Sequence, residues 1–348
     1  MTGVRAEIRS GRPADDERRD AFVRAHPRGS FFHLAGWRRA VETVFRHVPR
    51  DLYAWRGDEL VGVLPLMQSP RVLSGSNLIS MPYGVYGGPL GTDPEIEQAL
   101  LEAAVALADE SQVGTLELRY LHDPGPDLVG SSLYWVFIKD LPETEDEVLT
   151  RMPKKARAEA RKARDRHGLE ISEGVWYVDD LHRLFLKNKH VLGSPGMPPR
   201  LFRELLREFE GEVFVHLVRR DREPLAAVMS FAFEGTLIAY YSGTEPGADR
   251  AFSASNFLYM ALQQWAVRRG FQRFDFGRSR RDAGTFRFKV HQGFEPQPLH
   301  YRYHLVRSRG LPTFTPSNPR TAVLRNAWSR TPLWLAGRLS NRLARYLP

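Results

Sequence analysis

The 348-residue sequence contains no cysteine. This absence excludes disulfide bonds, thiolate catalysis and cysteine-rich zinc sites, and it fits a cytoplasmic location. The sequence also lacks an apolar run long enough to span a membrane, and its charged first twenty residues lack the apolar core of a signal peptide. We therefore expect any membrane contact to be peripheral. The histidines show no metal-ligand spacing, so we predict no metal site.

Apolar residues make up 42% and charged residues 26% of the sequence, which is the profile of a packed globular protein. The length leaves room for two domains of ordinary size. Lysine and arginine number 50 against 41 acidic residues. This excess of positive charge indicates an anionic partner such as a phosphate, RNA or an acidic membrane face, or it serves solubility alone.

A similar order of predicted elements occurs twice along the chain. In the first half, these are a helix over 34–45, a strand hairpin over 52–67, a helix over 95–108, and strands over 115–121 and 134–141. In the second half, they are strands over 214–219, 224–233 and 237–243, a helix over 255–269, and strands over 271–276 and 300–306. Each half predicts a mixed sheet with helices packed on it, although many α+β folds share such elements.

Between the halves, residues 151–168 are expected to form a basic linker helix. Its narrow apolar stripe consists of Ala156, Ala160 and Ala163. Lysine and arginine recur at three- and four-residue spacing beside that stripe, as Lys154, Arg157 and Arg161. Like charges so placed repel one another, and a solvated helix is one explanation of the row. We favour the other, in which these side chains bind phosphate or another anion.

The last segment, residues 311–348, mixes aromatic and aliphatic residues with arginine at helical spacing. Such a basic amphipathic tail is typical of a helix at a membrane surface, where the apolar side enters the headgroup layer and the arginines meet anionic lipid. Docking on the protein's own surface explains the same pattern, and we favour that interpretation.

The segment from 274 to 296 holds the largest number of candidate functional groups. A strand is expected to end at Gly277, with a loop presenting Arg278 and Ser279 at the sheet edge. Further on, Phe288 is expected to anchor in apolar surroundings beside Lys289. A lysine held in this way acts as a fixed cation near a developing oxyanion or a phosphate, and we expect it to face an open groove.

Together with the pattern at 31–37 and the basic helix, this segment resembles the FemAB-related family. The resemblance is strongest to the FemAB-like proteins found with the exosortase (PEP-CTERM) and exopolysaccharide systems of Gram-negative bacteria. It covers roughly residues 29–306, and the Phe288-Lys289 element with the following Gly293-Phe294-Glu295-Pro296 is its most specific part.

The resemblance implies two tandem GNAT-like (acyl-CoA N-acyltransferase) domains of mixed α/β sheets, an α+β fold. The first spans residues 1–150 and the second, with the catalytic segment, 169–310. It also implies an N-acyltransferase or aminoacyltransferase acting on an amine of a cell-envelope (peptidoglycan-type) or exopolysaccharide precursor. The donor is aminoacyl-tRNA or an acyl-CoA or other acyl thioester, with no cofactor bound permanently.

Two other functions remain open at this point. One is a non-catalytic protein that binds a polysaccharide or lipid-linked intermediate in an exosortase-linked export system, and the other is plain RNA binding. All of them fit a cytoplasmic protein, with possible peripheral contact at the inner face of the cell membrane.

The resemblance assigns transfer to Lys289 and a substrate-side role to Tyr241, and it places Trp37 and Arg39 in a substrate cleft. We add Asp275 as a possible base, but favour a structural carboxylate that pairs with an arginine. Neighbouring residues of a strand face opposite sides, so only one of Tyr240 and Tyr241 is expected to line a given cleft.

The loop with which GNAT enzymes hold the pyrophosphate of coenzyme A, Arg/Gln-x-x-Gly-x-Gly/Ala, has no clear counterpart here. The nearest string, 281–286, ends in phenylalanine and opens no evident helix. The stretch 253–256, at an expected helix start, offers backbone N–H groups that an anion can use.

Overall fold

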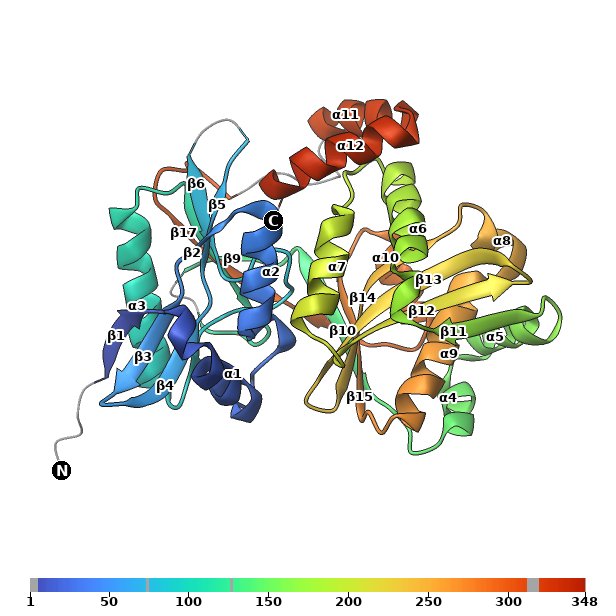
Figure 1. Cartoon of the computed structure of the whole chain (residues 1–348), viewed down its shortest axis with the longest axis horizontal. Coiled ribbons are helices and arrows are strands. Elements are labelled where there is room, and N and C mark those ends of the chain that lie inside the picture. Colours follow the sequence, from blue (N-terminus) through green and yellow to red (C-terminus); the bar gives the residue numbers. More distant parts are fainter. Residues whose placement is uncertain (1–5, 73–74, 126–127, 312–318, 348) are drawn as a thin grey trace. The chain divides into compact units, whose positions relative to one another are not determined.

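The computed structural model describes residues 6–72, 75–125, 128–311 and 319–347. It separates into two compact units (Figure 1). The first unit comprises Met1–Leu133, Pro298–Pro312 and Arg345–Pro348, and the second comprises Tyr134–Gln297 and Thr313–Ala344. Among the described residues, no helix has both the length and the apolar character needed to cross a membrane.

The described residues of the first unit form two sheets. One, with the order β1-β3-β4-β7, is built from Glu7–Ser10, Leu52–Arg56, Glu59–Leu64 and Leu90–Gly91. The other, with the order β2-β5-β6-β8-β17-β9, is built from Val48–Pro49, Met67–Pro70, Ser76–Ile79, Thr115–Tyr120, His300–Leu305 and Val129–Ser131. The helices are α1 (Asp16–Ala25), α2 (Ala35–Phe45) and α3 (Pro94–Glu110).

Helix α3 shows how local sequence builds this unit. The Asp93 side chain accepts a hydrogen bond from the Ile96 backbone N–H at 3.0 Å, and Pro94 occupies the first turn, so both signals for a helix start are present. The apolar side chains at four-residue spacing, Ile96, Leu100 and Ala104, are buried in the core of the first unit. The helix predicted over 95–108 is thereby confirmed.

The second unit has one sheet with the order β11-β12-β13-β14-β15-β10-β16. Its strands are Leu169–Glu173, Val213–Arg220, Glu223–Phe233, Thr236–Thr244, Arg273–Arg280, Tyr134–Asp140 and Pro296–Pro298. Its helices are α4 (Glu145–Arg151), α5 (Lys154–Asp165), α6 (Val178–Val191), α7 (Pro199–Glu208), α8 (Ala248–Phe252), α9 (Ala254–Arg268), α10 (Gly284–His291), α11 (Pro319–Arg330) and α12 (Leu333–Leu343).

The helices cover both faces of this sheet. Tyr241 of β14 packs against Phe185 of α6, whereas the next residue, Ser242, accepts a hydrogen bond from Tyr259 of α9 at 3.0 Å. Because consecutive strand residues point to opposite faces, α6 and α9 lie on opposite sides of the sheet.

In each unit, a helix joins two parallel neighbouring strands. In the first unit, β6 and β8 are parallel and α3 lies between them in the chain. In the second, β14 and β15 are parallel and α9 lies between them. The duplication predicted from element order therefore has a structural counterpart, a β-α-β crossover in each unit.

Two strands pair elsewhere than their positions in the sequence suggested. Strand β10, expected to close the first half, pairs with β15 in the second unit. Strand β17, expected to end the second half, pairs with β8 in the first unit. The expected boundaries at 150 and 169–310 differ from the observed units for this reason, since alternation of apolar residues predicts a strand but not its partner.

Helix α5 confirms the predicted apolar stripe, because Ala156, Ala160 and Ala163 are all buried. It does not link two halves, however. It packs against α9 within the second unit. Of the predicted tail, α11 and α12 are described and contact α6, while residues 312–318 and 348 lie outside the described residues.

Candidate active site

Strand β15 has a bulge at the predicted motif. Val136 pairs with Arg278 and Ile138 with Asp275, so Phe276 and Gly277 together face the single residue between them on β10. Gly277 has φ of +67°, which favours glycine, and its N–H donates to the Asp275 carboxylate at 2.7 Å. Asp275 is buried and shapes the bulge. The strand continues to Arg280, so the expected end at Gly277 is wrong.

Lys289 lies beneath this bulge. Its ammonium donates to the carbonyl oxygens of Gly277 at 3.0 Å and Arg278 at 3.1 Å. The rings of Phe137 and Phe276 each lie 5.2 Å from the nitrogen. The side chain is buried, where we expected it to face an open groove. α10 turns the lysine inward because Phe288 packs near Tyr259 and Phe276.

Burial lowers the pKa of Lys289 to about 7, because removing an ammonium from water is costly. The nearby carboxylate of Asp275 raises this pKa and the guanidinium of Arg278 lowers it further. Two carbonyl acceptors and two aromatic faces hold the charged form in place. Near neutral pH both protonation states of Lys289, the ammonium and the amine, are therefore populated.

The bulge coincides with the end of the parallel pairing between β14 and β15. The ladder joins Thr236, Leu237 and Ile238 of β14 to residues 273–275, and neither strand stops there. The parallel ladder ends at this point. The two carbonyls that Lys289 binds belong to Gly277 and Arg278, just beyond the last paired residue of β15.

Strand β14 has a bulge of its own at Tyr240. Met229 of β13 pairs with Tyr241 and Ser230 pairs with Ala239, which leaves Tyr240 as the extra residue. The rings of Tyr240 and Tyr241 lie only 4.8 Å apart. The expectation that the two rings face opposite sides is therefore wrong, because the bulge interrupts the alternation.

Tyr241 lies on the α6 and α7 face of the sheet and is buried. Its ring packs against Phe185 of α6 and Phe202 of α7, with centroids 5.8 and 5.0 Å away. Apolar packing from two helices fixes the ring, so the hydroxyl has a defined position. Tyr241 remains a predicted substrate-side residue.

Arg278 affects the pKa of two lysines, Lys189 and Lys289. It lowers the pKa of Lys189 on α6 as well as that of Lys289, although burial is the larger cause in both cases. Its guanidinium also lies over the Tyr134 ring at 4.6 Å. The hydroxyl of its neighbour Ser279 is buried and has no hydrogen-bond partner among the described residues. Sequence reasoning missed Lys189, which shares no motif with the 274–296 segment.

The helix start at α9 is already capped. The carboxylate of Asp249 accepts hydrogen bonds from the Ser255 N–H at 2.7 Å and the Ser255 hydroxyl at 2.9 Å. A second anion here would meet that negative charge, and the Ser255 N–H is already used by the protein, so the arrangement disfavours the predicted anion position at 253–256. The string 281–286 does lead into a helix, α10, contrary to expectation.

Trp37 and Arg39 belong to the first unit. Trp37 is fully buried, donates through Nε1 to the Pro82 carbonyl at 3.0 Å, and packs edge-on to Phe31 and Phe32. This pattern therefore builds the core of the first unit, whereas we had predicted a role for Trp37 in substrate binding. Arg39 is partly exposed and pairs with Asp16 at 2.8 Å.

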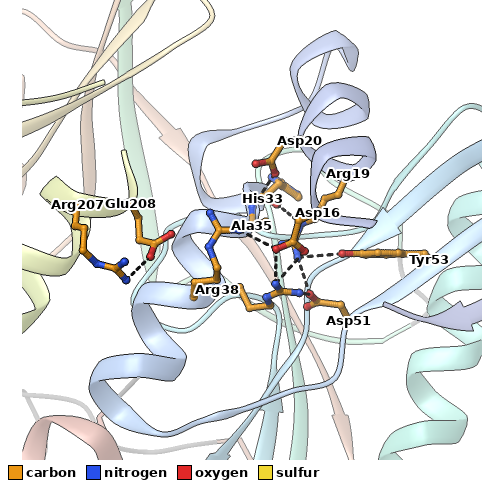
Figure 2. Close-up of polar contacts among 11 residues, drawn as sticks. Asp16, Arg19, Asp20, His33, Ala35, Arg38, Asp51, Tyr53, Arg207 and Glu208 are labelled. Atoms are coloured by element: carbon orange, nitrogen blue, oxygen red, sulfur yellow. Dashed lines mark hydrogen bonds and ion pairs between the residues drawn. The ribbon is translucent and has the colours of Figure 1, made fainter. Parts of the chain in front are cut away.

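Figure 2 shows an ion-pair network that includes Asp16, Arg19 and Asp51. Arg19 donates to Asp51 at 2.6 Å and to the His33 carbonyl at 2.7 Å, and its side chain is completely buried. Arg38 donates to both carboxylate oxygens of Asp16. These pairs join α1, α2 and the start of β3, so their charges serve the structure of the first unit.

The predicted anion-binding residues of α5 lie along one exposed side of the helix. Lys154 and Arg161 are exposed, and Arg157 is half-buried and donates to the Thr150 carbonyl at 3.3 Å. Anion binding by this row stays a prediction. Among the described residues, no three His, Asp or Glu side chains come together as metal ligands.

Residues 150–290 match the model of a family described as an acetyltransferase (GNAT) domain. This range includes β14, α9, β15 and Lys289. The chain has a tandem GNAT fold. The predicted fold class is confirmed, and the domain match confirms the prediction of an acyltransferase.

Solved structures show the same architecture over nearly the whole chain. The crystal structure of FemX matches with a TM-score of 0.64 at 13% identity, covering 92% of this chain and 100% of FemX. A tandem GNAT protein from the clavulanic acid biosynthesis pathway matches with a TM-score of 0.55 at 14% identity, covering 88% and 99%.

A third match is the C-terminal domain of an Agrobacterium fabrum protein assigned as a lysylphosphatidylglycerol synthetase. Its TM-score is 0.55 at 15% identity, and the match covers 90% of this chain and 95% of that domain. At sequence identities of 13–15%, these three matches show a common fold and nothing more. No curated protein sequence matches the chain.

Proposed function

We propose that this protein transfers an activated acyl or aminoacyl group to an amine of a cell-envelope or exopolysaccharide precursor, as in the FemAB-like proteins of exosortase-linked systems. The observation that carries the proposal is a buried lysine, Lys289, held at the point where β14 and β15 stop pairing. The acetyltransferase domain match and the fold shared with FemX support it.

The reaction joins the acceptor nitrogen to the donor carbonyl carbon. The bond from that carbon to the donor's oxygen or sulfur breaks, and the proton lost by the nitrogen goes to this leaving group. Negative charge develops on the carbonyl oxygen, and a cation fixed in a medium of low polarity stabilises it strongly. We assign this role to the ammonium of Lys289, with Arg278 adding positive charge.

The remaining site residues of the second unit have supporting roles in this proposal. The Tyr241 hydroxyl orients the acceptor amine, and Asp275 keeps the bulge in shape through the Gly277 N–H. Phe288 turns Lys289 inward, and Ser279 offers a buried hydroxyl for the substrate. Positioning of this kind carries much of the catalysis in acyl transfer, so no catalytic triad is needed.

The donor is aminoacyl-tRNA or an acyl thioester such as acyl-CoA. The GNAT domain match favours an acyl thioester. The carboxylate of Asp249 at the start of α9 opposes an anion there, and the basic row of Lys154, Arg157 and Arg161 offers an alternative position for donor phosphates. We propose that the reaction takes place in the cytoplasm, at the inner face of the cell membrane.

The test supplies each donor separately to the purified full-length protein. Radiolabelled acetyl-CoA and tRNA charged with radiolabelled amino acids are each incubated with glucosamine and with a bacterial extract of lipid-linked precursors. We expect label to pass from one of the donors to an amine product. Lys289→Met should reduce the rate at least about a hundredfold by removing the fixed charge. Lys155→Met, which alters an exposed lysine of α5, should keep the wild-type rate.

Two results would overturn the proposal. If neither donor is consumed while the precursors bind, the protein is a non-catalytic binding protein. Equal rates for Lys289→Met and the wild type would show that the buried lysine takes no part in transfer.

A further inference from the structure

Helix α12 docks on the second unit through its small residues. Ala336 and Ser340 are buried, and the Ser340 hydroxyl accepts a hydrogen bond from the Gly196 N–H at 3.0 Å. Gly337 lies against Leu186 of α6, where an added Cβ would be 3.2 Å from a Leu186 methyl carbon. The side of α12 that packs on the second unit therefore consists of small residues.

Three large apolar side chains of α12 are exposed, whereas Leu333 and Leu335 are half-buried. Trp334 is 63% exposed, and Leu339 and Leu343 are also exposed. Arg338 and Arg342 are exposed beside them, and the Arg338 guanidinium lies 5.5 Å from the Trp334 ring. A helix that only needed to dock on its own protein would bury its tryptophan and leucines and expose its small residues. In α12, by contrast, Ala336 and Ser340 are buried while Trp334 is exposed.

Two apolar residues at the end of α6 are exposed as well. Val191 is 62% exposed and Leu192 is 59% exposed. The preceding residue, His190, is hydrogen-bonded through Nε2 to the Thr331 carbonyl at 2.7 Å, just before α12 begins. The C-terminal end of α6 and the α11–α12 connection therefore lie side by side (Figure 1).

The sequence from residue 296 onward is strongly basic, and three of its arginines, Arg330, Arg338 and Arg342, are exposed in the second unit. Residues 296–348 contain nine arginines and no lysine or acidic residue, so this segment carries the whole formal excess of +9 and the remaining chain is balanced. We call the following set the tail surface: Val191, Leu192, Trp334, Leu339 and Leu343, with Arg330, Arg338 and Arg342.

We propose that the tail surface binds the face of an anionic lipid bilayer. Tryptophan and leucine enter the boundary between headgroups and acyl chains, and arginines on the same helix meet lipid phosphates. The absence of acidic residues in this segment excludes the repulsion that they would cause at a negative surface. This inference goes beyond acyl transfer and holds whether or not the protein is catalytic.

The experiment measures flotation of the full-length protein with lipid vesicles at about 0.1 M salt. Vesicles of phosphatidylcholine alone are compared with vesicles containing about 30% phosphatidylglycerol. We expect binding only to the anionic vesicles. The double variant Arg338→Gln/Arg342→Gln should bind roughly 30-fold more weakly, since each arginine near such a surface contributes about 1 kcal/mol. Trp334→Ser should bind about tenfold more weakly.

Matched controls come from exposed residues elsewhere in the second unit. Trp176 is exposed near the opposite end of α6, so Trp176→Ser removes a similar ring outside the tail surface. Arg222→Gln/Arg250→Gln removes two exposed arginines. Both controls should float like the wild type, and thermal unfolding should show that all variants fold.

Three outcomes would overturn the inference. The first is no flotation with anionic vesicles, and the second is equal loss of binding in the tail-surface and control variants. The third is displacement of the protein from vesicles by a weight of deacylated tRNA equal to that of the lipid, together with weaker tRNA binding by the Arg338→Gln/Arg342→Gln variant. That last result would assign the surface to RNA.

Discussion

Replacing Lys289 with methionine tests whether the charge of this lysine is truly suppressed by burial. Methionine has a similar length and no charge, so it fills the same space between Phe137 and Phe276. It leaves the Gly277 and Arg278 carbonyls without their donor, which costs about 1–3 kcal/mol. It also removes the cost of burying an ammonium. These opposing effects make the pH dependence more informative than the absolute stability.

The magnitude follows from the pKa of Lys289, which is about 7 in the folded protein against an ordinary value of 10.5. Between pH 7 and pH 10.5, Lys289 binds more protons in the unfolded chain than in the folded one, so wild-type stability rises with pH. From pH 7 to pH 8.5 this group should add about 1.6 kcal/mol to the free energy of unfolding. Below pH 7 both states are protonated and the contribution changes little.

Urea unfolding of both proteins at pH 6, 7, 7.75 and 8.5 measures this difference. We expect the gap between the wild type and Lys289→Met to move by about 1.6 kcal/mol in favour of the wild type from pH 7 to pH 8.5. Other titrating groups are common to both proteins and cancel. If the two stability curves stay parallel over this range, the lysine is not held in the environment described, and the electrostatic argument for catalysis fails with it.

Three further substitutions test the framework around the sites. Asp51→Asn should lower the free energy of unfolding by about 3–5 kcal/mol, because it leaves buried arginines without their carboxylate, and urea titration measures the loss. Asp249→Asn should cost about 1 kcal/mol by weakening the cap on Ser255, and an unchanged melting temperature would contradict this. Gly277→Ala should cost about 1–2 kcal/mol from its left-handed backbone alone, since the space around it is open, and a fully stable variant would refute that account.

Much of the local structure could be predicted from sequence because it depends on neighbours in the chain. Helix α3 follows from apolar spacing and its Asp93-Pro94 start, and the hairpin of β3 and β4 follows from the alternation around Gly57. The buried alanine stripe of α5 was predictable for the same reason. Each of these features is decided within about a dozen residues.

Features that depend on distant partners could not be predicted in this way. The bulges at Tyr240 and Gly277 are visible only once β13 and β10 are paired with their neighbours. Periodicity showed that α12 is amphipathic, but which side docks depends on the shape of α6. Lys289 was singled out by family resemblance, and its burial depends on α10 folding back onto β15.

The exchange of β10 and β17 has a consequence during synthesis. The first unit needs β17, which leaves the ribosome about 170 residues after β9. At roughly 5–20 residues per second, this unit waits on the order of ten to thirty seconds with the edge of β8 uncovered. The second unit has all its strands by residue 298, before the first can be completed. The half that is made first therefore finishes last, and a ribosome that stalls before residue 300 leaves an incomplete sheet exposed to aggregation.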